Sequence, residues 1–97
     1  MFYAKVFTTK YDVLVAICDR ELLGKKIRWK DFEIVVSKSF YGGEIVDENE
    51  CVELMKKATI GNLMGKKIVE LSIKEGFIEK KNVIVIDGVP HAQFVKL

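Results

Sequence analysis

Proline and histidine are nearly absent from this chain, since each occurs once and the two are adjacent as Pro90-His91. Cysteine is also scarce, because Cys18 and Cys51 are the only two and they share no metal-type spacing. One histidine and two separated cysteines are too few ligands for a structural zinc site. Each cysteine lies in an apolar pattern, which favours buried thiols over a disulfide. No cofactor motif is complete, so we expect neither a metal nor a cofactor.

Long hydrophobic runs are missing as well. The longest apolar run, Val13–Cys18, has the length of a strand, whereas a membrane helix needs about 18 or more apolar residues. The N-terminal residues lack the basic and then apolar layout of a signal peptide. We therefore expect no membrane association, and the cytoplasm is the expected compartment.

The composition that remains is that of a folded protein. Of the 97 residues, 49% are hydrophobic and 10% are aromatic, so we expect residues 1–97 to form a single globular domain around one core. The net charge of +2 predicts little bulk attraction to nucleic acid. Lysine and glutamate are abundant while glutamine and asparagine are rare, a composition typical of heat-adapted organisms.

Alternating patterns and apolar runs predict strands at both ends of the chain. The first four predicted strands should pair as two hairpins. A helical turn is predicted at 19–24, with Asp19 as its N-cap and Gly24 as a left-handed stop. The predicted strands are 2–8, 13–18, 26–29, 32–37, 83–86 and, as a short return strand, 92–95.

Two helices are predicted between these strands. The first covers about 48–59, with Asp47 or Glu48 as its N-cap. Gly61-Asn62 predicts a break, after which a second helix covers about 62–75 with Asn62 as its cap. Strands at both ends with two helices between them predict an α+β fold, in which a mixed or antiparallel sheet packs against the helices.

Four segments occur in order along the chain, namely Leu22-Leu23-Gly24, Phe40-Tyr41-Gly42-Gly43-Glu44, Ala58-Thr59-Ile60-Gly61-Asn62-Leu63-Met64-Gly65 and Gly88-Val89-Pro90-His91-Ala92-Gln93. Together they resemble an archaeal family known as domain of unknown function 424, over nearly the whole chain. The resemblance implies a small, single-domain cytoplasmic protein and supplies no activity. One departure is Gly61, where alanine is expected; a glycine inside a helix costs about 1 kcal/mol relative to alanine.

The strongest functional lead is a basic stretch with an aromatic residue inside it. Cations bind phosphates and a ring stacks on bases, which is what a nucleic-acid-binding face needs. Acidic neighbours dilute the stretch, so a solvated surface with a half-buried indole is the alternative. We hypothesise a non-catalytic binding module associated with RNA or the ribosome. Its candidate residues are Arg20, Lys25, Lys26, Arg28, Trp29 and Lys30.

A second hypothesis is a small-ligand protein or an enzyme built around the lone histidine. Pro90 stiffens the segment that presents His91, which could then act as a general acid or base. The alternative is a structural histidine whose ring nitrogens bond backbone carbonyls. The Tyr-Gly-Gly segment could cradle an anion, but a tight turn also explains it. The hypothesis requires the two segments to meet in one concave site, formed by Tyr41, Gly42, Gly43, Pro90, His91 and Gln93.

Two further surfaces are left open. An edge strand near 2–8 or 92–97 could accept a partner strand, which would make the chain an adaptor or a homodimer. An acidic stretch could bind a divalent cation or a basic partner, although the helix dipole already accounts for several of its charges. Its residues are Glu44, Asp47, Glu48, Glu50 and Glu53.

Overall fold

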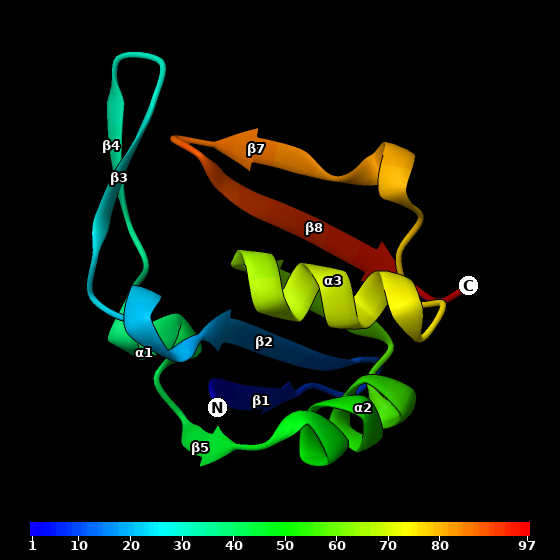
Figure 1. Ribbon diagram of the computed structural model, residues 1–97. Helices are drawn as coiled ribbons and strands as arrows, with labels where there is room; N and C mark the ends of the chain where they lie inside the picture. The colour runs from blue at the N-terminus through cyan, green and yellow to red at the C-terminus, as the bar shows by residue number, and fades with distance from the viewer.

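A six-stranded mixed sheet forms the centre of the computed structural model, which describes residues 1–97 (Figure 1). The strand order is β5-β1-β2-β6-β8-β7, with β2 and β6 parallel and every other neighbouring pair antiparallel. The predicted α+β class and the first hairpin, β1–β2, are confirmed. The strands are β1 (Phe2–Thr8), β2 (Val13–Asp19), β5 (Glu44–Val46), β6 (Ile60–Met64), β7 (Ile84–Ile86) and β8 (Val89–Val95).

Helices α2 (Glu48–Lys57) and α3 (Lys66–Lys74) cover one face of the sheet (Figure 1). Between the helices and the sheet lies the larger core, because each helix turns one apolar side inward. None of the helices is long and apolar enough to cross a membrane. Fully buried members of this core are Val15, Ile17, Cys51, Met55, Leu63 and Ile68.

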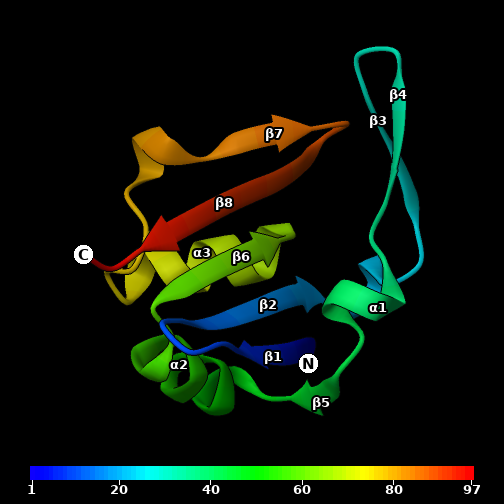
Figure 2. The same cartoon turned by 180° about the vertical axis from the view of Figure 1, so that it is seen from behind.

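The opposite face of the sheet is covered only in part. The short helix α1 (Lys38–Tyr41) and a separate hairpin of β3 (Lys26–Trp29) and β4 (Phe32–Val35) lie at one end of it. Figure 2 shows β6 and β8 from this side, and the β3–β4 hairpin projects from the rest of the molecule. We call this hairpin the arm. A smaller core under its base contains Ala16, Cys18, Ile27, Val36, Tyr41, Met64 and Ile86.

Several local signals have the predicted effect. Asp47 and Glu50 form a capping box at the start of α2, so Asp47 is the N-cap. Gly24 has a left-handed φ of 84°, after the 3₁₀ turn η1 (Arg20–Leu22). Gly76, with φ 82°, ends α3. The N-cap at Asp47 and the left-handed stop at Gly24 were predicted correctly because each depends on residues close by in the sequence.

The predicted start of the second helix is wrong. Residues 60–64 form strand β6 and α3 begins only at Lys66, so Asn62 caps no helix. A Cβ atom on Gly61 would lie 2.0 Å from Cε2 of Phe94, so the glycine makes room for that ring across the β6–β8 pair. Gly65 occupies the N-cap position of α3 and has no side chain to bond the helix. The carboxylate of Asp19 at the end of β2 accepts hydrogen bonds from the Lys67 and Ile68 N–H groups instead, each at 2.9 Å. Asp19 was predicted to cap the helical turn at 19–24, but its side chain makes no bond to η1 and bonds the start of α3 instead.

Other boundaries differ by a few residues. The return strand predicted at 92–95 begins at Val89, because Asp87 and Gly88 both have positive φ and form a two-residue turn directly after β7. Pro90 lies inside β8 and still accepts a bond from the Gly65 N–H at 2.8 Å. Strands β4 and β7 are shorter than predicted, α2 ends at Lys57, and α1 was not predicted.

Candidate binding surfaces

The six residues of the basic stretch all belong to the arm and its base. Arg20 lies in η1 and Lys25 precedes β3, while Lys26 and Arg28 lie on β3 and Lys30 in the turn to β4. Every one of these cations is exposed. The structure therefore places Lys26, Arg28, Trp29 and Lys30 on the projecting hairpin, with Arg20 and Lys25 at its base (Figure 1).

The two faces of the arm differ in chemistry. Residues that pair directly across an antiparallel hairpin share a face. Lys26 and Arg28 share one face with Glu33, and the Lys26–Glu33 ion pair measures 3.7 Å. Trp29 pairs with Phe32 on the other face. Trp29 is 38% exposed and Phe32 69%, so the indole is partly covered and the phenyl ring largely open; both lie on the separate hairpin and not in the main sheet.

The arm is attached to the body through the middle of β3. Ile27 is buried in the smaller core, and the Arg28 N–H donates a hydrogen bond of 3.0 Å to Oδ2 of Asp87 in the β7–β8 turn. Beyond that bond lie Trp29, Phe32 and the turn between them, where the ammonium of Lys30 is 5.6 Å from the centre of the Trp29 ring. The aromatic pair thus lies at the free end of the arm.

The Tyr-Gly-Gly segment has a packing role. Tyr41 is buried and its hydroxyl donates to Oδ1 of Asn62, while burial raises the pKa of the phenol above its usual range. The N–H groups of Gly42 and Gly43 bond the carbonyls of Lys38 and Tyr41, each at 2.9 Å. Neither N–H is free to bind an anion.

His91 lies on β8, on the sheet face that α2 and α3 leave uncovered. Its ring is half buried, Nδ1 has no hydrogen-bond partner, and burial lowers the pKa of the imidazole. A hollow of about 260 Å³ beside the ring is lined by Asn82, Ile84, His91, Ala92 and Gln93.

Tyr41 and His91 lie on the same side of the sheet without lining the same hollow. Asn62 receives the Tyr41 hydroxyl bond and pairs with Gln93 across β6–β8, whereas His91 pairs with Met64. Sequence reasoning missed Asn62 because it assigned the residue to a helix cap. The strand signal that could have found it, Ile60 followed by Leu63-Met64, is interrupted by Gly61-Asn62.

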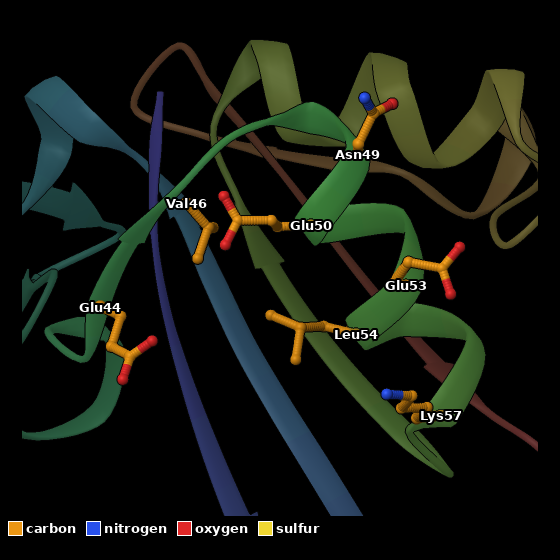
Figure 3. A pocket seen from close by; sticks show the side chains of 7 residues that line it. All are labelled: Glu44, Val46, Asn49, Glu50, Glu53, Leu54 and Lys57. Carbon is orange, nitrogen blue, oxygen red and sulfur yellow. The ribbon is translucent and has the colours of Figure 1, made fainter.

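A second hollow lies between β5 and α2 (Figure 3). Its volume is about 320 Å³, and carboxylates from both elements line it. No group of three or more His, Cys, Asp or Glu side chains is arranged to hold a metal ion. We call it the acidic hollow; its lining residues are Glu44, Val46, Asn49, Glu50, Glu53, Leu54 and Lys57.

Neither cysteine has the environment of a reactive thiol. Cys18 and Cys51 are buried and unpaired with each other, as predicted. Burial raises the pKa of each thiol to about 12, so almost none of either is thiolate near neutral pH.

Comparisons with known proteins agree with this geometry. A family model described as "Protein of unknown function (DUF424)" matches residues 7–97. The fold resembles a crystal structure of an uncharacterized conserved protein from Methanopyrus kandleri, with a TM-score of 0.85 and 20% sequence identity, over 99% of this chain and 93% of that one. No curated protein matches the chain.

Proposed function

The chain belongs to the DUF424 family, and we propose that it is a non-catalytic cytoplasmic module that binds RNA, such as the RNA of the translation apparatus, through its arm. The observation that carries the proposal is the exposed pair Trp29 and Phe32 at the free end of a cation-bearing hairpin. Neighbouring exposed aromatic rings form an apolar patch, and such patches can mark the place where a partner binds.

The two faces of the arm suit different parts of an RNA molecule. Lys26, Arg28 and Lys30 would contact phosphates, which supply affinity without reading sequence. Trp29 and Phe32 would stack on unpaired bases in a loop or bulge, each stack contributing about 1–3 kcal/mol. Because the rings and the strand cations lie on opposite faces, the arm would be contacted from both sides.

A cross-strand aromatic pair also stabilises its own hairpin, by about 0.2–1 kcal/mol. That contribution does not require exposed ring faces. The hairpin is also stabilised by its bond to Asp87 and by the burial of Ile27, so it depends less on the aromatic pair. The exposure of Trp29 and Phe32 therefore supports a partner-binding role over a purely structural one.

The experiment uses Trp29, the only tryptophan of the chain, as its own reporter. An RNA hairpin with a single-stranded loop is titrated into the protein at low salt, and stacking on the indole should quench its fluorescence. The double variant Lys26→Glu with Arg28→Glu should weaken binding by roughly tenfold or more and reduce the salt slope by about two.

The matched control is Lys80→Glu with Lys81→Glu, since these two exposed cations lie in the 3₁₀ turn η2 (Lys80–Asn82), away from the arm. Equal weakening by both charge reversals would mean that only net charge matters. That result would remove the proposal. An absence of quenching at tens of micromolar protein would also remove it, because even non-specific binding to nucleic acid has dissociation constants of about 10–100 μM.

A second candidate function is the binding of a small polar ligand at His91. The observation that favours it is the unpartnered Nδ1 beside the hollow of about 260 Å³. Titration of the His91 ring by NMR against small-molecule mixtures would show a ligand as a shift confined to the hollow. A His91 resonance that no compound moves would count against this candidate.

A further inference from the structure

We propose that the outer edge of β1, together with the acidic hollow, binds an extended segment of a partner protein that carries lysine or arginine side chains. The segment would add a strand to the sheet alongside β1 and place its cations among the carboxylates. This mode of recognition takes affinity from backbone hydrogen bonds and specificity from pockets for alternate side chains. It is independent of RNA binding by the arm.

Half of the outer edge of β1 has no partner strand. β5 pairs only with Phe2–Ala4 and leaves Lys5–Thr8 uncovered. The Thr9 N–H donates to the Asp12 carbonyl in the β1–β2 turn, which fixes the alternation of hydrogen bonds along the strand. The peptide groups of Val6 and Thr8 therefore point outward, as an open template for another strand.

Two adjoining hollows, which we together call the groove, lie beside this free edge. A hollow of about 330 Å³, lined in part by Ala4, Lys5 and Val6 of β1, adjoins the acidic hollow. The two hollows share Glu44, Val46 and Leu54. In Figure 3 the Leu54 side chain points from α2 toward β5, across the space where β1 passes behind. The groove thus offers an apolar floor next to unpaired backbone groups.

The charges around the groove select a basic segment. Glu44 makes no ion pair, and Glu50 accepts only the Asp47 N–H at 3.1 Å. Glu53 pairs loosely with Lys56 at 3.4 Å, on a surface where such pairs contribute little. Of the two lysines that line the groove, Lys5 directs its ammonium to the Ser39 carbonyl at 2.8 Å. The groove therefore contains three carboxylates, those of Glu44, Glu50 and Glu53, and only one cation, Lys57, that is not already bonded elsewhere.

The probe is a blocked peptide of alternating lysine and valine, about ten residues long, with a glutamate–valine peptide of equal length as its control. Amide resonances of the ¹⁵N-labelled protein are followed during titration at low salt. The lysine peptide should shift and protect the amides of Val6 and Thr8 and the signals of α2. The glutamate peptide should leave them unchanged.

Two pairs of variants make the test specific. Val6→Pro removes an outward N–H donor, while Val6→Thr keeps it and serves as the matched control. Glu44→Lys with Glu53→Lys reverses charge in the groove, whereas Glu70→Lys with Glu75→Lys makes the same change on exposed positions of α3 and its end. The first variant of each pair should lower the affinity for the lysine peptide about tenfold or more. The second variant should lower it by less than about threefold. Circular dichroism confirms that each variant is folded.

Three outcomes would overturn the proposal. The first is no binding of the lysine peptide at about 1 mM, the weakest affinity of interest. The second is equal weakening by the two charge-reversal pairs, which would show attraction by overall charge alone. The third is self-association of the protein that Val6→Pro abolishes, because the occupant of the edge would then be a second copy of this chain.

Discussion

The side chain of Asp87 fastens the arm to the body by accepting a hydrogen bond of 3.0 Å from the Arg28 N–H. Asp87 itself has a φ of 51° in the turn between β7 and β8, a conformation that aspartate and asparagine tolerate better than other side chains. One residue thus shapes a turn and positions an element that lies 59 residues away in sequence.

Replacing Asp87 by alanine should loosen the arm. The change removes the acceptor for the Arg28 N–H and places alanine in a left-handed conformation, so we expect a loss of about 1–2 kcal/mol in unfolding free energy. Urea unfolding measures the loss, and hydrogen exchange at the Arg28 amide measures the local effect. Asp87→Asn keeps an acceptor and the turn, and should lose less than half as much; a larger loss for asparagine would contradict this account.

Gly61→Ala should destabilise the protein through a clash and not through backbone entropy. An added Cβ would lie 2.0 Å from the Phe94 ring, which is itself stacked on Phe77 at 5.6 Å. Overpacking of this kind costs about 1–3 kcal/mol. Phe94→Leu made together with Gly61→Ala should recover part of the loss. Thermal unfolding of the two single variants and the double variant gives the coupling, and purely additive losses would show that the ring is not the cause.

The stability contribution of Asp19 should fall as the pH rises. This carboxyl is 2% exposed, and burial raises its pKa in the folded protein. The folded state then holds the proton more tightly than the unfolded state does. Its contribution is complete below the unfolded pKa, about 3.9, and is lost as the pH rises through the folded-state pKa.

Asp19→Asn does not titrate, so it isolates this dependence. The difference in unfolding free energy between the native protein and the variant should be largest in acid and should shrink toward neutral pH. Urea unfolding of both proteins at a series of pH values checks it. A difference that grows with pH would mean that the bonds from the Lys67 and Ile68 N–H groups outweigh the burial of the charge.

Both thiols should be unreactive while the protein is folded. Burial raises the pKa of Cys18 and Cys51 to about 12, and neither side chain is accessible. A thiol reagent at mildly alkaline pH should label both only at the rate at which the protein opens, and at once in denaturant. Rapid labelling of one thiol in the native protein would show that its part of the core is open.

The elements that sequence predicted well are those with local causes. The β1–β2 hairpin follows from alternation on both sides of a short polar turn, and the capping box at Asp47 from residues three positions apart. β6 was missed because Gly61-Asn62 resembles a helix break when Phe94 is not known to lie opposite. The pairing of β2 with β6 connects residues more than forty positions apart, and no local pattern specifies it.

The candidate sites follow the same division. The basic stretch was recognisable because its six residues fall within eleven positions of the sequence, and four of them fold into the arm. The acidic stretch was identified too, but the groove lined by its residues Glu44, Glu50 and Glu53 depends on how far β5 extends along β1. The connection from Tyr41 to Gln93 passes through Asn62, and its discovery required the sheet order.

The base of the arm is closed by backbone bonds from Gly24 N–H to the Val36 carbonyl at 2.7 Å and from Val36 N–H to the Lys25 carbonyl at 2.9 Å. The two ends of the arm are therefore held together independently of its length, and beyond Arg28 the hairpin has no further bond to the body. Natural insertions or deletions of one residue in each strand would change its reach by about 3.4 Å at a time. Such a change in length would leave the two bonds that close the base of the arm in place.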